Sequence, residues 1–123
     1  MWIFTTRGFY SAVEHTGNPG WIHLRARFKG DLERLLEAHK CLVTDAREQV
    51  GEIRHTPSAD YRYRVDIRRE LFAQIVAAEC MAINYSNFKS SCPANGFEGR
   101  HAAYLDVWCA MRRSQDTARR RGK

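Results

Sequence analysis

The stretch that decides the fold is Tyr61-Arg62-Tyr63-Arg64-Val65-Asp66-Ile67-Arg68, in which charged and apolar residues alternate. A second stretch, Ile22-His23-Leu24-Arg25-Ala26-Arg27-Phe28, repeats this alternation. Successive side chains of a β-strand point to opposite faces of the sheet, so these strands are apolar on one face and basic on the other. We expect the core positions to be Leu24, Ala26, Phe28, Tyr61, Tyr63, Val65 and Ile67, with arginines on the opposite face.

The flanking sequence predicts a strand, strand, helix order that occurs twice. In the first unit, a strand over residues 9–15 and a strand over 21–29 enclose the turn Thr16-Gly17-Asn18-Pro19-Gly20. A helix over residues 31–41 follows, with Asp31 as its N-cap.

After a loop over residues 43–51, the second unit has strands over 52–56 and 61–68 around a turn. A helix follows directly, because apolar residues then recur every three or four positions, at Leu71, Ile75, Val76, Ala78, Ala82 and Ile83.

These units predict an α+β fold: one four-stranded antiparallel sheet with both helices packed on one face. A loop over residues 84–99 leads to a third helix over residues 100–114, whose apolar face includes Tyr104, Val107, Trp108 and Met111. This helix either leaves the arginines open or lies across them. We predict one domain over residues 1–115 and a basic tail over 116–123.

Composition limits the class of protein. With 123 residues and 44% hydrophobic content, the chain fits a single domain. The net charge is +6, but the residues after Met111 hold six basic side chains and one acid, so the body is nearly neutral. We expect a cytoplasmic protein with no membrane partner, because no long apolar run or secretory signal is present.

Six arginines form the principal candidate site, an anion-binding sheet face. Guanidinium groups form bidentate bonds to phosphate and to carboxylate, so the expected partner is nucleic acid or an acidic protein surface. In the alternative, the face is only solvated, and Asp66, Glu52 and Glu14 neutralise it across the strands. The six residues are Arg25, Arg27, Arg54, Arg62, Arg64 and Arg68.

A secondary cluster could combine an imidazole, a phenol and an amine. His101, Tyr104 and Trp108 share one helical stripe, and Lys89 precedes them in the loop with Tyr85 and Asn87. His101, Lys89 and Tyr104 are the weak catalytic candidates. In the alternative, this cluster is a packed edge of the core.

No metal or cofactor is expected. The four cysteines, Cys41, Cys80, Cys92 and Cys109, contain no Cys-x-x-Cys pair, and a zinc site from Cys80, Cys92, His101 and Cys109 would match no known spacing. Cys80 and Cys109 fall in apolar helical patterns and are expected to be buried. His15, His23, His39 and His55 are predicted to be separate surface residues.

Several phrases together resemble a family of short bacterial and phage proteins that carry no assigned activity. They are Gly8-Phe9-Tyr10-Ser11, Thr56-Pro57 with Ala59-Asp60-Tyr61-Arg62-Tyr63-Arg64, Asn84-Tyr85-Ser86-Asn87-Phe88-Lys89, and His101 with Tyr104 and Trp108. The family usually has an acid at the position of Asn84. The resemblance implies a bacterial or phage source and admits inhibitors of bacterial immunity.

The sequence therefore predicts a small non-enzymatic binding module, a monomer or homodimer, that docks an anionic partner. Nucleic acid is the first candidate. One alternative is a phage or mobile-element inhibitor that binds a host protein, and another is a small enzyme that uses His101, Lys89 and Tyr104.

Overall fold

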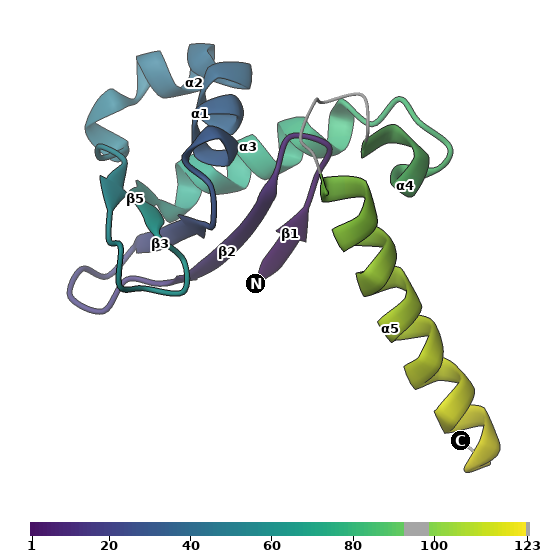
Figure 1. Ribbon diagram of the computed structural model, residues 1–123. Coiled ribbons are helices and arrows are strands. Elements are labelled where there is room, and N and C mark those ends of the chain that lie inside the picture. Colours follow the sequence, from purple (N-terminus) through teal and green to yellow (C-terminus); the bar gives the residue numbers. More distant parts are fainter. Residues whose placement is uncertain (93–98, 123) are drawn as a thin grey trace. The chain divides into compact units, whose positions relative to one another are not determined.

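The computed structural model describes residues 1–92 and 99–122, which belong to two units that we treat separately (Figure 1). The first unit, Met1–Asn84, contains an antiparallel sheet and its helices, and the second, Tyr85–Lys123, is helical. The expected α+β class with one antiparallel sheet is confirmed. Within the described residues, no helix is both long and apolar enough to cross a membrane.

The sheet has five strands where four were expected. The opening residues Trp2–Phe4 form an additional strand, because they pair with Phe9–Ser11. The strands, in their order across the sheet, are β1 (Trp2–Phe4), β2 (Phe9–Glu14), β3 (Trp21–Ala26), β5 (Tyr63–Arg68) and β4 (Arg54–His55).

The two alternating stretches are neighbours at the centre of the sheet. In the antiparallel ladder between β3 and β5, Leu24 lies opposite Val65 and Ile22 lies opposite Ile67. All four side chains are buried in the hydrophobic core, together with Tyr10, Ala12, Ala26, Leu32, Leu35, Leu71, Phe72 and Ile75. Phe28 was expected in this core but is 49% exposed, because β3 ends at Ala26.

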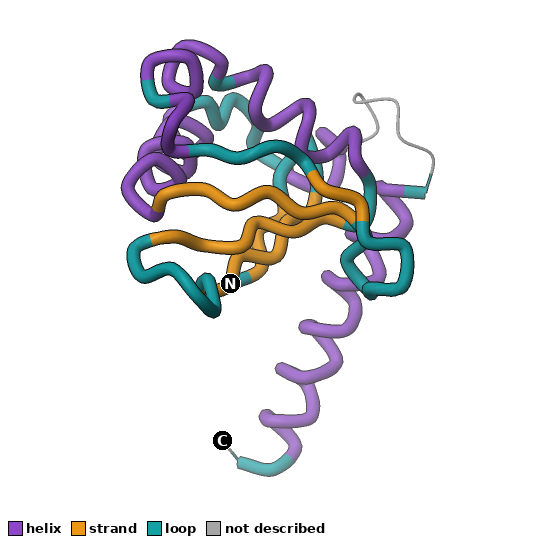
Figure 2. The backbone as a smooth tube through the Cα atoms, turned by 90° about the vertical axis from the view of Figure 1, so that its left-hand side faces the viewer, coloured by secondary structure: helices purple, strands orange, loops and turns teal. Residues whose placement is uncertain are grey.

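Helices α1 (Lys29–Ala38) and α3 (Arg69–Met81) bury their apolar stripes on the same face of the sheet, as expected (Figure 2). Because α3 ends at Met81, Ala82 and Ile83 are exposed and do not extend the predicted stripe.

The segment predicted as a loop over residues 43–51 is largely helical. Helix α2 (Lys40–Asp45) and a 3₁₀ turn, Arg47–Gln49, precede β4. Leu42, Val43 and Ala46 pack at helical spacing against the core, so apolar burial outweighs the polar composition of this segment.

Asp31 was expected to be the N-cap of α1, but it is not. The cap position is Phe28, three residues earlier than predicted, and Asp31 is a buried residue of the first helical turn. Its carboxylate accepts a hydrogen bond from the Phe9 amide (3.0 Å) and forms an ion pair with Arg34. Asp31 therefore joins α1 to the start of β2.

The turn between β1 and β2 is held by further polar contacts. The Arg7 Nε atom and the His39 Nε2 atom both lie within hydrogen-bonding distance of Glu79 Oε1, at 2.8 and 2.7 Å. The Tyr10 hydroxyl donates to the Asp31 carbonyl (2.7 Å), and burial raises the pKa of this phenol. These contacts connect the turn to both α1 and α3.

In the second unit, the third helix is longer than predicted. Helix α5 (Arg100–Arg120) begins where expected but continues six residues past 114, so the proposed boundary at residue 115 lies inside it. The expected loop over residues 84–99 contains a short helix, α4 (Phe88–Ser91), while its residues 93–98 lie outside the described residues, as does Lys123.

The cysteines differ from expectation in burial. Cys80 is exposed and Cys109 is only partly buried, whereas Cys92 is fully buried. Burial raises the pKa of the Cys92 thiol, and this thiol donates to the Phe88 carbonyl (3.2 Å). Cys92 therefore serves as a small core residue where α4 ends.

Gly8 provides a test of the turn between β1 and β2. A Cβ atom at Gly8 would lie 2.7 Å from side-chain atoms of both Asp31 and Tyr10. We expect Gly8→Ala to lower the free energy of unfolding by about 1–3 kcal/mol in urea denaturation, because the buried neighbours must move. Gly17→Ala is the matched control, since its Cβ would meet only a His15 ring atom at 3.9 Å. Equal effects of the two substitutions would contradict this role for Gly8.

Candidate anion-binding face

The predicted arginines that lie within strands, Arg25, Arg54, Arg64 and Arg68, are on the side of the sheet opposite the core. Arg27, just after β3, lies over the Tyr61 ring beside Arg25, and Arg62, just before β5, is exposed. We call Arg25, Arg27, Arg54, Arg62, Arg64 and Arg68 the arginine face. Arg25 of β3 lies opposite Arg64 of β5, which also lies opposite Arg54 of β4. Three adjacent strands thus place arginines side by side, an arrangement that like-charge repulsion disfavours.

Tyr61 offsets part of the repulsion between these arginines. The guanidinium carbons of Arg25 and Arg27 lie 4.7 and 4.6 Å from the centre of its ring, within cation–π range. The Tyr61 side chain is buried, as expected, but under these two arginines and outside the main hydrophobic cluster. Tyr63, in contrast, packs against that cluster and stacks on His55.

Neutral groups hold three of the arginines. Arg25 Nη2 donates to the Ser11 hydroxyl (2.8 Å), and Arg27 Nη1 donates to the Asp60 carbonyl (3.1 Å). Arg64 Nε donates to the Tyr61 carbonyl (3.4 Å). Such contacts orient the guanidinium groups and leave their positive charge uncompensated.

Only part of the arginine face is paired with acids. Arg54 forms two hydrogen bonds to Asp66, and Arg68 lies 3.7 Å from Glu70 and near the Trp21 ring. Of the three acids expected to neutralise this face across the strands, only Asp66 forms such an ion pair within the part of the chain that the structure describes. Among the described residues, no carboxylate lies within ion-pair distance of the remaining four, Arg25, Arg27, Arg62 and Arg64.

The histidines were expected to be separate surface residues, but two of them are in contact. His15 and His23 stack with their ring centres 4.1 Å apart, and Asp66 lies beside both rings. His23 Nδ1 donates to Asp66 Oδ1 (2.7 Å), and His15 Nε2 lies 3.4 Å from Asp66 Oδ2. Strand pairing places His23 opposite Asp66, a relation that sequence spacing alone does not reveal.

These three residues are donor types that transition metals use. The contacts favour an ion-pair network instead. Arg54 already donates to both Asp66 oxygens, and the Gly17 amide donates to His15 Nδ1, which leaves the hydrogen of the neutral ring on Nε2, facing Asp66. A metal would have to displace a guanidinium group and change this tautomer.

The network stabilises the charged form of Asp66. Hydrogen bonds from Arg54, and then from His23, lower the pKa of its carboxyl to about 2, although partial burial opposes the shift. Asp66 thus remains ionised at neutral pH and neutralises one end of the arginine face.

The secondary cluster belongs to the second unit and packs as a small aromatic core. The Phe88 ring stacks on Tyr104 at 5.4 Å and also contacts Tyr85. The Asn87 side chain caps α4 by accepting from the Ser90 amide.

The three catalytic candidates have different partners. The Lys89 ammonium lies over the Trp108 ring at 4.9 Å, while His101 Nδ1 contacts the Lys89 carbonyl at 2.7 Å. The Tyr104 hydroxyl is buried and accepts from Arg100 (2.9 Å). These contacts give each side chain a structural role and lend no support to an acid–base centre.

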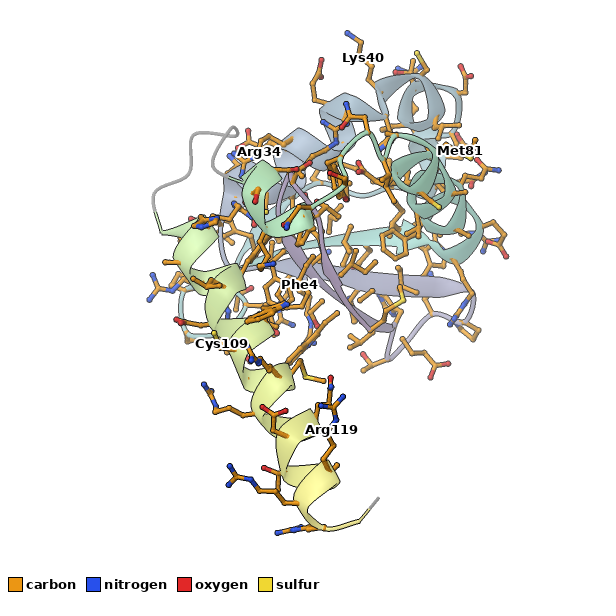
Figure 3. All side chains as sticks on the ribbon, turned by 90° about the vertical axis from the view of Figure 1, so that its right-hand side faces the viewer. Phe4, Arg34, Lys40, Met81, Cys109 and Arg119 are labelled. Atoms are coloured by element: carbon orange, nitrogen blue, oxygen red, sulfur yellow. The ribbon has the colours of Figure 1, made fainter. Side chains whose placement is uncertain are left out.

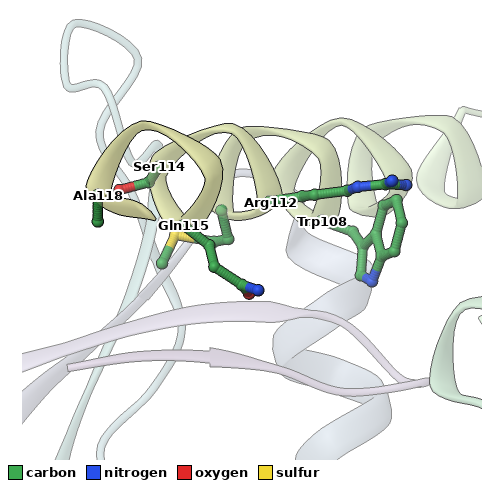
Figure 4. Close-up of a pocket in the computed structure, with 6 residues that line it drawn as sticks. Trp108, Arg112, Ser114, Gln115 and Ala118 are labelled. Atoms are coloured by element: carbon green, nitrogen blue, oxygen red, sulfur yellow. The ribbon is translucent and has the colours of Figure 1, made fainter. Parts of the chain in front are cut away.

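Helix α5 also carries basic residues beyond this core. Arg119 lies near its C-terminal end (Figure 3), and Trp108, Arg112, Gln115 and Ala118 line a shallow hollow along one side (Figure 4). Arg112 lies 4.0 Å from Asp116, at the limit of an ion pair. The guanidinium carbon of Arg112 also lies 5.5 Å from the centre of the Trp108 ring, so α5 is a second basic surface with an aromatic contact of its own.

Comparison with known protein families, curated proteins and solved structures found no match to this chain.

The network around Asp66 predicts a defined pH dependence. Because the folded-state pKa is lowered from 3.8 to about 2, the carboxylate contributes stability above about pH 4 and loses it as the pH falls towards 2. We expect Asp66→Asn to lower the free energy of unfolding at pH 7 by about 1 kcal/mol, since solvent screens the network.

Urea unfolding between pH 2 and pH 7 checks this expectation. The difference from the original protein should shrink as the pH falls below 4 and be mostly lost at pH 2, where the carboxyl is almost fully protonated in the unfolded state and about half protonated in the folded state. Asp45→Asn, at an exposed carboxyl at the end of α2, is the control and should have little effect at any pH. A difference for Asp66→Asn that stays constant down to pH 2 would contradict the electrostatic explanation.

Proposed function

We propose that this chain is a small non-enzymatic binding module that docks nucleic acid through its arginine face. The observation that carries the proposal is that four arginines, Arg25, Arg27, Arg62 and Arg64, have no carboxylate partner among the described residues, while two of them, Arg25 and Arg27, lie over the Tyr61 ring. A sheet that places these charges together gives up stability, and a polyanionic partner recovers it.

The way the arginines are held supports a phosphate partner. Ser11, Asp60 and Tyr61 supply neutral contacts to Arg25, Arg27 and Arg64, so the guanidinium groups are positioned before any ligand arrives. Ordered arginines lose less side-chain entropy on binding than free ones, and their planar forks fit phosphate oxygens. Arg25 Nε is additionally buried without a hydrogen-bond partner in the described structure.

Nucleic acid fits this face better than a small anion does. The arginine positions extend across β3, β5 and β4, and neighbouring strands are about 5 Å apart. A single phosphate cannot reach all of them, whereas a polynucleotide backbone presents phosphates repeatedly along its length. The binding should be strongly salt-dependent and little affected by base sequence.

The central test replaces Arg25, Arg27, Arg62 and Arg64 together with glutamine. Fluorescence anisotropy with labelled oligonucleotides should show nearly complete loss of binding at about 0.1 M salt, because counterion release supplies most of the affinity. If residual binding is measurable, the slope of log K against log salt should fall by about 3, the value for four lost phosphate contacts to a single strand.

A matched variant removes the same charge from α5. Replacing Arg112, Arg113, Arg119 and Arg120 with glutamine lowers the net charge equally but leaves the sheet unchanged. We expect this variant to lose only a small part of the affinity, because the arginine face is intact. The proposal fails if the sheet variant, shown to be folded by circular dichroism, binds as tightly as the original protein, or if only the α5 variant loses binding.

A further inference from the structure

The sheet face beside the arginines carries aromatic side chains that the charge pattern does not explain. In the ladder between β1 and β2, Phe4 lies opposite Phe9 and Trp2 lies opposite Ser11. Ser11 also lies opposite Arg25, so strand alternation places Trp2, Phe4 and Phe9 on the same side of the sheet as that arginine.

These rings form a continuous row. Phe4 and Phe9 stack with their centres 4.6 Å apart, and the Trp2 ring meets Phe9 edge to face at 5.8 Å. Phe9 in turn lies 6.3 Å from Tyr61, the ring that supports Arg25 and Arg27. The row therefore leads directly from the exposed strand β1 to the uncompensated arginines.

Trp2 is the accessible member of this row. Its side chain is 67% exposed, whereas Tyr61 is buried and Phe9 is partly buried. An exposed tryptophan on a sheet face is unfavourable for the isolated protein, since its apolar surface stays in contact with water. One edge-to-face contact, with Phe9, orients the indole and leaves most of its surface accessible to a flat ligand.

We propose that the partner of the arginine face is a single-stranded nucleic acid and that Trp2 stacks on one of its bases. This inference rests on the proposed function and narrows its substrate class. A single strand exposes the flat faces of its bases, which duplexes bury between neighbouring base pairs, and aromatic side chains beside a basic surface are the usual means of binding it.

The dimensions are compatible with one strand touching both regions. One strand, β2, separates β1 from β3, so Trp2 and Arg25 belong to strands about 10 Å apart. About three nucleotides at a stacked spacing of about 3.4 Å span this distance. A base on Trp2 and phosphates at Arg25 and Arg27 can thus come from the same short segment.

The experiment compares Trp2→Ala and Trp2→Phe in binding to a labelled oligo(dT) or oligo(rU) of about 15 nucleotides, and to a duplex of the same length. The original protein should prefer the single strands. Trp2→Ala should weaken single-strand binding on the order of 5- to 100-fold, the usual effect of losing one stacked base, and should leave weak duplex binding and the salt slope unchanged. Trp2→Phe should retain most of the affinity.

Two further variants separate stacking from other effects of the substitution. Trp2→Leu preserves apolar bulk but has no ring, so it should bind as weakly as Trp2→Ala. Met81→Ala removes an exposed apolar side chain from α3, on the core side of the sheet, and should bind like the original protein. Oligo(dT) should also quench tryptophan fluorescence in the original protein more than in Trp2→Phe.

The outcomes distinguish this inference from the proposed function. If Trp2→Ala and Trp2→Leu bind single strands as tightly as the original protein while the sheet-arginine variant does not, the stacking inference fails and the proposed function stands. Equal affinity of the original protein for duplex and single strand also overturns the inference. If the original protein binds neither form, both proposals fail.

Discussion

The pairing of β3 with β5 in a single register is the constraint on which the rest of the structure depends. It places Leu24 opposite Val65 in the core and, on the other face, Arg25 opposite Arg64. Because side chains alternate with a period of two, a shift of one residue would move the apolar side chains into water and the arginines into the core. Burial of the core therefore forces the arginines together, whatever their mutual repulsion.

The arginine face resolves this repulsion differently at its two ends. Near β4, Asp66 forms an ion pair with Arg54 and also contacts His15 and His23. The positive charge of Arg54 is therefore largely neutralised within the protein. Near Tyr61, an aromatic ring and neutral oxygen atoms support the guanidinium groups without cancelling them. The two ends of the sheet face therefore differ in charge. At one end Asp66 neutralises Arg54, and at the other end Arg25 and Arg27 keep their positive charge.

The features that sequence can predict are those with a local period. Alternation identified the central strands, and a three-to-four spacing identified α3 with its buried Leu71 and Ile75. The same reasoning missed β1, which is only three residues long and is defined by its pairing with β2. It also misassigned Asp31, since a buried acid in a first helical turn has the same sequence pattern as a capping residue.

The candidate site was predictable to a similar extent. Alternation predicts the face of the arginines that lie within strands, but their partners are set by residues distant in the sequence. Asp66 meets His15 across β3, and Tyr61 is buried under arginines and not in the apolar cluster, because it precedes β5 in a turn. Contacts of this kind depend on strand order and turn geometry, which a single sequence does not encode in any simple period.

The arginines and the aromatic row of Trp2, Phe4 and Phe9 occupy adjoining parts of one sheet face, and they contribute differently to binding. Guanidinium groups attract any polyanion and cannot by themselves distinguish a duplex from a single strand. An exposed aromatic ring stacks on the bases of a single strand and not on those of a duplex, but it has no charge that attracts either form from a distance. Phe9 connects the parts, since its ring contacts Trp2 on one side and Tyr61 on the other. Single-stranded nucleic acid, the partner that we propose, combines phosphates for the arginines with accessible flat bases for Trp2.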